Sequence, residues 1–403
     1  MLDTSRPRRG PSPRRLFAIA AGAAAACFIL TLSYGYADHA PAPHGVQIAV
    51  AAPPGVVREV SAGLGRAAPG GFTVLPVPSA AAVRSSVLSQ SAAGGLAAAG
   101  AGPVTVVTAA AAGSSQQQAV AAALTATATA LHRQVRLLDV APLPPGDRAG
   151  LSVFVFELGL LIPSVLASIG LYFLGRRLRI WWRVTAAAAF ALLAACGSVL
   201  VLDAVFGALS GVPWALTGVG MFGALTFVAF VTACQAVTGL PGTGLAALVL
   251  VFTGNAVSDG TIPFAFLPEG FRQVAPWLPN GAIVSAARDV TYLPASDLAH
   301  PLLVLAIWLA ASLAVLAAVD LLHLAERRRT PEQQADIYAT SGTTHLRRRL
   351  TRPQTAAARR DDHPLGLINS RLYWLSAERA PGIVPVTSGN NTVTFTQGTP
   401  VKT

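Results

Sequence analysis

Six long apolar stretches constrain the fold of this chain more than any other feature of its sequence. The first, Leu16–Tyr36, consists of apolar or small residues and is long enough, at about 1.5 Å per helical residue, to cross a hydrocarbon core of about 30 Å. The same pattern recurs five times later in the chain. We predict membrane-spanning helices at about 16–36, 151–174, 184–209, 214–237, 244–260 and 301–324.

The composition agrees with a membrane protein and excludes a soluble enzyme. Hydrophobic residues make up 53% of the chain and charged residues only 12%, with a mean hydropathy of +0.55, whereas soluble domains carry about 25% charge. The net charge of +11 comes from arginines beside apolar stretches and in the C-terminal region. This placement favours membrane topology and anionic lipid headgroups rather than nucleic acid as the reason for the charge.

The arginine clusters also predict the orientation of the chain in a plasma membrane. They lie in residues 1–15, after the second span and after the sixth span. The positive-inside rule therefore places 1–15 and the basic, largely disordered tail 325–403 in the cytoplasm, and 37–150 outside. A cleaved signal peptide is the alternative for the first span, but its apolar core exceeds the usual 7–15 residues.

Residues 37–150 have the alternating pattern of a small α/β domain inserted between the first two spans. Strand-like runs occupy 46–53, 72–78, 103–110 and 135–144, and helical patterns occupy 53–68, 79–100 and 114–134. Such alternation predicts a largely parallel sheet. The predicted fold class is thus an α-helical integral membrane bundle of six spans with an extracytoplasmic α/β domain.

No motif for catalysis, nucleotide binding or metal binding is found. GxxxxGK[ST], HExxH and GxSxG do not occur, the histidines lack metal-ligand spacing, and all three cysteines fall in apolar stretches. A GxGxxG match at 218–223 lies inside a span, where small residues serve close helix packing. We therefore predict no enzymatic activity, no cofactor and no metal.

Acidic residues inside the spans are candidates for a transport pathway. Glu157 falls near the outer end of the second span and Asp203 towards the outer end of the third. Charges at the centre of a membrane are costly and often functional, but positions near an interface are tolerated. The two interpretations, pathway residues and tolerated interfacial residues, both remain open from the sequence.

The outer loop 261–298, between the fifth and sixth spans, is apolar, aromatic and cut by prolines. We predict that Pro263–Leu293 forms two short helices that cap the bundle, either gating a pathway or acting only as a lid. Asn280-Gly281 is the expected break between pieces. Four charged residues are expected to face water: Glu269, Arg272, Arg288 and Asp289.

The region around this loop resembles the type-2 ABC transporter permeases, and within them the phage-infection-protein-like (YhgE/Pip) branch. The resemblance rests on the order of spans and on a set of residues in about forty positions: Asn255, Ser258, Leu267-Pro268, Leu278-Pro279, Gly281 and Arg288. Asp259, next to Ser258, joins them as a candidate pathway or gating residue.

The resemblance implies a permease that moves a hydrophobic or amphiphilic substrate outward. Two copies, as a homodimer or heterodimer among membrane lipids, would form the pathway, and a separate ATP-binding subunit would supply energy. Such permeases dock that subunit through a cytoplasmic loop after the second span, which here is only about Gly175–Arg183. The alternative function is a non-transporting scaffold or receptor whose external domain binds an envelope ligand or protein.

Overall fold

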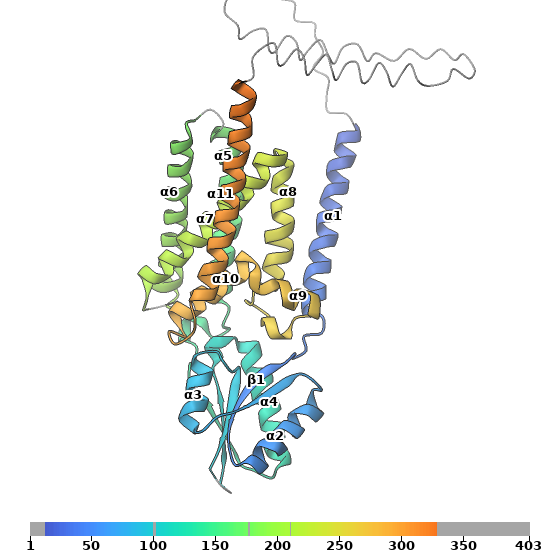
Figure 1. Ribbon diagram of the computed structural model, residues 1–403, viewed down its shortest axis with the longest axis vertical. Coiled ribbons are helices and arrows are strands. Elements are labelled where there is room, and N and C mark those ends of the chain that lie inside the picture. The colour runs from blue at the N-terminus through green and yellow to red at the C-terminus, as the bar shows by residue number, and fades with distance from the viewer. Residues whose placement is uncertain (1–12, 100–101, 176–177, 210, 329–403) are drawn as a thin grey trace, which may run out of the picture. The chain divides into compact units, whose positions relative to one another are not determined.

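A computed structural model describes residues 13–99, 102–175, 178–209 and 211–328 (Figure 1). Within these residues five helices are long and apolar enough to cross a membrane, so the chain is a multi-pass membrane protein. They are α1 Pro13–Asp38, α5 Ser152–Gly175, α6 Ile180–Val199 with its π-helical continuation η3 Leu200–Val205, α7 Pro213–Thr238 and α11 Ala299–Arg328. The expected basic segment 1–15 falls mostly outside the described residues, and so does the expected disordered tail beyond Arg328.

The stretch expected as the fifth of six spans is shorter and less regular than the others. It begins at Pro241 and ends at Val257, and it changes from α8 Pro241–Ala247 to the π-helical η4 Leu248–Gly254 and the 3-10 turn η5 Asn255–Val257. Its 17 residues span about 25 Å as a helix. The structure thus has five candidate spans and one short apolar helix in place of six similar spans.

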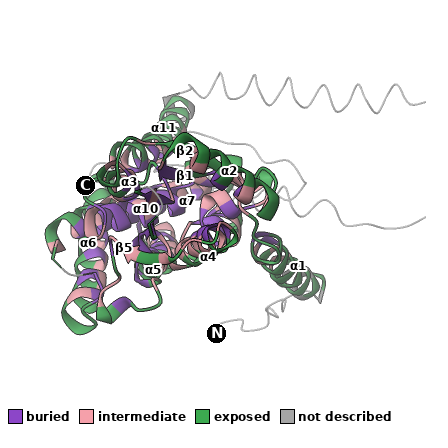
Figure 2. Cartoon of the chain, turned by 90° about the horizontal axis from the view of Figure 1, so that it is seen from below, coloured by how far each residue is buried: buried purple, intermediate pink, exposed green. Residues whose placement is uncertain are grey.

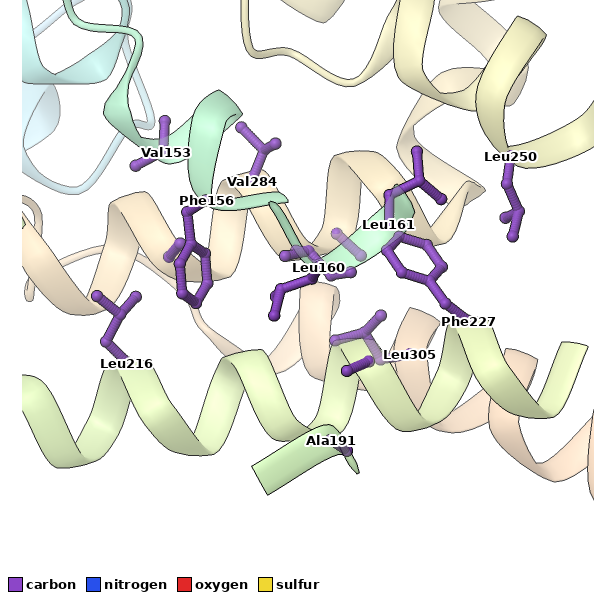
Figure 3. Packing of buried hydrophobic residues seen from close by; sticks show 14 of the residues in the cluster. Val153, Phe156, Leu160, Leu161, Ala191, Leu216, Phe227, Leu250, Val284 and Leu305 are labelled. Atoms are coloured by element: carbon purple, nitrogen blue, oxygen red, sulfur yellow. The ribbon is translucent and has the colours of Figure 1, made fainter. Parts of the chain in front are cut away.

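Helix α7 lies at the centre of the bundle and contacts α5, α6, α10 and α11. Phe227 and Leu216 of α7 pack with Phe156 and Leu160 of α5 in the main hydrophobic core (Figure 3). Two glycines of α7 allow this close approach. A Cβ at Gly220 would lie 2.8 Å from the Phe156 ring, and one at Gly223 would lie 2.6 Å from the side chain of Ile283, which gives the GxGxxG match a packing role.

Helix α1 contacts the bundle mainly through the short helix 248–257. Seen along the bundle, α1 lies to one side and is coloured largely as exposed (Figure 2). A helix with this much apolar surface outside the core presents it to lipid or to another protein chain.

The residues between α1 and α5 form a five-stranded sheet with helices on both faces. The strand order is β2-β1-β3-β4-β5. β1 (Val46–Ala51) pairs in parallel with β2 (Phe72–Pro76) and β3 (Gly94–Ala98), and β4 (Val104–Thr108) pairs in parallel with β5 (Val135–Asp139). Helices α2 (Pro54–Ala67) and α4 (Ser114–Ala130) contribute to one core cluster, and α3 (Ala80–Leu88) contributes to another.

One detail of this domain differs from the sequence prediction. The stretch 79–100 was expected to be one helix, but α3 ends at Leu88 and the remainder contains the central strand β3. Glycines at β3 explain this error, because they leave no room for larger side chains: a Cβ at Gly94 would lie 2.5 Å from Val120 of α4, and one at Gly95 would lie 2.4 Å from Val83 of α3. The sheet is largely parallel, as predicted, and only the pair of β3 with β4 is antiparallel.

The outer loop, expected to form two short helices, forms two short α-helices and two 3-10 turns. They are η6 Phe264–Phe266, α9 Glu269–Val274, η7 Ala275–Trp277 and α10 Pro279–Thr291. The loop packs against two hydrophobic cores at once. Ile283 of α10 belongs to the core of the bundle, and Phe266 belongs to the core of the sheet domain.

Candidate functional site

Helix α10 brings an asparagine against a buried carboxyl group of the bundle. Pro276 lies within the preceding turn η7, and Pro279 starts α10, so that Asn280 stands in the first turn of this helix. The Asn280 Nδ2 amide donates hydrogen bonds to Glu157 Oε1 at 2.6 Å and to the Leu250 carbonyl oxygen at 3.1 Å. Glu157 and Asn280 are both 0% exposed. The contact therefore joins α5, α10 and η4 in the interior.

Further buried polar groups lie at the end of the short helix 241–257, where its geometry is irregular. Asn255, which is buried, donates a hydrogen bond from its amide to the Tyr34 hydroxyl of α1. Ser258 is also buried, one residue beyond η5. Gly254 is required at its position because a Cβ there would lie 2.2 Å from Asn280 Oδ1. The change from α to π and 3-10 geometry thus places polar side chains where a straight apolar helix would place none.

A buried ion pair lies beyond the end of the short helix, on the side that faces the sheet domain. Arg288 of α10 forms a salt bridge with the Asp259 carboxylate, and its second guanidinium nitrogen donates to the Asp259 carbonyl oxygen at 2.6 Å. Asp259 has φ of 65° and also accepts a hydrogen bond from the Phe264 N–H at 3.2 Å. Burial raises the pKa of Asp259, and Arg288 partly opposes this shift. Among the described residues this is the only ion pair.

The expectation that Arg288 and Asp289 face water is wrong. Their exposed fractions are 3% and 6%. α10 runs between the bundle and the sheet domain rather than over an open surface, so its charged residues meet protein on both sides. Glu269 is exposed and Arg272 is half-buried, in closer agreement with the prediction.

The C-terminal part of α10 is hydrogen-bonded to the sheet domain. The Gln90 side-chain amide donates to Asp289 Oδ1 at 2.6 Å, and the Tyr292 hydroxyl lies 2.9 Å from Asp147 Oδ2. Burial raises the pKa of Asp289, and burial together with the Asp147 charge raises the pKa of Tyr292. One helix therefore contacts a buried carboxyl group of the bundle at its start, and the segment at its end is hydrogen-bonded to the sheet domain.

The structure places five of the six candidate residues on or around α10: Glu157, Asn255, Asp259, Gly281 and Arg288. Gly281 packs tightly, since a Cβ would lie 2.7 Å from the Phe264 ring. A larger side chain at Gly281 would disturb the packing of the loop. Such a variant therefore cannot separate a role in gating from a role in folding. Asp203 lies apart in η3, half-buried, and its side chain joins none of these hydrogen bonds.

Two residues of the site were not among the sequence candidates. Asn280 was recognised only as a helix break, although an asparagine between Pro279 and Gly281 in an apolar loop is an available polar signal. Tyr34 sits in the first span, more than 200 residues from Asn255 in the chain. Nothing in a single sequence indicates that long-range pair.

The arrangement offers acceptor oxygens around the break in the short helix. Four buried oxygens of described residues at this site have no hydrogen-bond partner: Glu157 Oε2, Asn255 Oδ1, Ser258 Oγ and Asn280 Oδ1. In the part of the chain that the structure describes, no group of three or more His, Cys, Asp or Glu side chains is placed to hold a metal ion.

The chain matches no protein-family model, and no curated protein and no solved structure shows significant similarity to it.

Proposed function

We propose that the chain is a permease-like membrane protein, the membrane subunit of an exporter that moves a hydrophobic or amphiphilic substrate outward. The observation that carries the proposal is the broken helix 241–257, whose buried polar end faces Glu157 and Asn280 inside a bundle of apolar helices. Helices that unwind within a membrane, with buried polar groups around the break, are typical of transport pathways.

The surrounding architecture supports a pathway that opens towards the sheet domain. The break, α10 and the ion pair all lie at the end of the bundle that is hydrogen-bonded to that domain. The arginine clusters favour an orientation with the same end outside the membrane. In this proposal the short helix 241–257 acts as a sixth membrane segment, and the exposed apolar surface of α1 contacts a second permease subunit.

Energy would come from a separate ATP-binding subunit, because the sequence contains no phosphate-binding loop. The connection between α5 and α6, from Gly175 to Ile180, is short for docking such a subunit. The turn between α7 and α8, from Thr238 to Pro241, is on the same side and extends the available surface.

A second function, a non-transporting scaffold or receptor, is favoured by the same short connection. It is also favoured by the hydrogen bonds that fix α10 to the sheet domain. A rigidly held external domain suits ligand display, whereas a gate must move.

Isolation of the full chain in mild detergent distinguishes these functions. The exporter proposal expects an ATP-binding subunit to co-purify, and it expects ATP hydrolysis only by that complex, with no ATP binding by the chain alone. Co-purification of an envelope protein without any ATP-binding subunit would contradict transport and support the scaffold. A variant with the sheet domain disturbed at Gly95 is the matched control, because an ATP-binding subunit on the other side of the membrane should be retained.

A further inference from the structure

We propose that Glu157, Asn280 and the broken helix 248–257 bind one monovalent cation, a sodium ion or a proton, inside the bundle. The proposal concerns binding alone, so it stands independently of whether the chain transports a substrate.

The first argument is charge. Glu157 is 0% exposed, and no ion pair of this carboxyl group is present among the described residues. Its hydrogen bond comes from a neutral amide, Asn280 Nδ2. An isolated carboxylate in an apolar interior is strongly unfavourable, and a bound cation removes that cost.

The neighbouring charged groups do not neutralise Glu157. Helices α6, α7, α8 and α10 pack against α5, and their charged side chains are Arg183, Arg288 and Asp289. Arg183 lies beside Gly175 at the opposite end of α5. Arg288 is paired with Asp259, and Asp289 accepts from Gln90. From α1, the Tyr34 hydroxyl is the titratable group that interacts electrostatically with Glu157.

The second argument is the supply of oxygen ligands. Glu157 Oε2 and Asn280 Oδ1 are buried acceptors without partners, and Asn255 Oδ1 and Ser258 Oγ are two more at the adjoining helix end. Asn280 Oδ1 and the Val249 carbonyl oxygen lie 2.2 and 3.0 Å from the point that a Cβ of Gly254 would occupy. Side-chain and unwound backbone oxygens of this kind bind protons or sodium in membrane proteins.

The third argument is the size of the charge. A single carboxylate compensates one positive charge, whereas a divalent ion would leave an excess charge in the interior. Binding would also act on Asn280, which belongs to α10, and on Asn255, which is hydrogen-bonded to Tyr34 of α1. The cation would therefore bias the two helices that flank the break.

The test measures thermal unfolding of the purified full chain in detergent. Sodium chloride is titrated against choline chloride at constant ionic strength, and the pH is varied in a sodium-free series. A sodium site predicts a rise in the unfolding midpoint of about 3 °C at saturating sodium. A proton site predicts a similar rise on acidification without sodium.

Either response should be lost in Glu157→Gln and weakened in Gly254→Ala, whose methyl group displaces Asn280 Oδ1. Glu269→Gln is the matched control, because Glu269 is an exposed acid on α9 and should keep the response. If the variants do not fold, infrared difference spectra of the wild-type chain give a second measurement: sodium or a proton should change the band of a buried carboxyl group.

The proposal is overturned if wild type and Glu157→Gln respond identically to sodium and to pH. It is equally overturned if no buried carboxyl band changes under either condition. Either result would mean that the polar groups around Glu157 and Asn280 hold ordered water and no cation.

Discussion

Replacing Arg288 by alanine should destabilise the folded protein by about 3–5 kcal/mol, the usual cost of leaving one partner of a buried ion pair without the other. Asp259 would keep a buried carboxylate, and the hydrogen bond to its own carbonyl oxygen would be lost as well. The measurement is the unfolding midpoint of the purified chain in detergent. Arg272→Ala, at a half-buried position on α9, is the matched control and should change the midpoint little.

The pH dependence of the same variant gives an independent check. Burial already raises the pKa of Asp259 above its ordinary value, and Arg288 opposes that shift. Without Arg288 the pKa should rise further, so the neutral carboxyl is favoured in the folded state. A group whose pKa is raised by folding stabilises the protein below its unfolded pKa and loses that effect as the pH rises through its folded pKa.

Arg288→Ala should therefore recover stability on acidification more than the wild type does. The double variant Arg288→Met with Asp259→Asn should also recover most of the loss, because no unpaired charge remains. An Arg288→Ala midpoint equal to that of the wild type at neutral pH would show that the pair does not stabilise the loop.

Gly95→Ala should destabilise the sheet domain by about 2–3 kcal/mol, at the upper end for overpacking a core. The new methyl group would lie 2.4 Å from Val83 Cγ1 and 2.6 Å from the carbonyl oxygen of Ala49. The valine side chain can rotate, but the Ala49 oxygen belongs to the neighbouring strand β1 and cannot move without opening the sheet. The measurement is hydrogen exchange of the β1 and β3 amides in the full chain.

Gly65→Ala is the matched control for this prediction, because it is the same chemical change in the exposed part of α2 with nothing within 4 Å of the new Cβ. It should stabilise the helix by about 0.5–1 kcal/mol. Equal exchange rates in the two variants would contradict the packing described for β3.

The sequence was sufficient for the elements with a strong pattern. The apolar periodicity and length of α5, α6, α7 and α11 predicted those spans to within a few residues, and the β-branched runs predicted β1, β2, β4 and β5. β3 was missed because its residues, Gly94 to Ala98, carry no strand signal of their own. Their small size matters only once helices pack on both faces of the sheet, which is a tertiary constraint.

The candidate site was predicted in part for a similar reason. Prolines and aromatic residues indicated the short helices of the outer loop, and Glu157 and Asn255 were recognisable as polar residues in or beside apolar stretches. The sequence could not indicate that α10 enters the space between bundle and sheet domain. Arg288 and Asp289 were therefore expected in water, although partners distant in the chain, Asp259 and Gln90, bury them.

Outward transport driven by a separate subunit can be measured in inside-out vesicles from cells that produce the chain. A fluorescent amphiphilic probe should enter the vesicle lumen when ATP is added, and vesicles from cells that lack the chain should show no such uptake. Arg288→Ala should reduce the uptake, while Arg272→Ala should retain it. ATP-dependent uptake that is the same with and without the chain would contradict the exporter proposal and leave the scaffold as the better account.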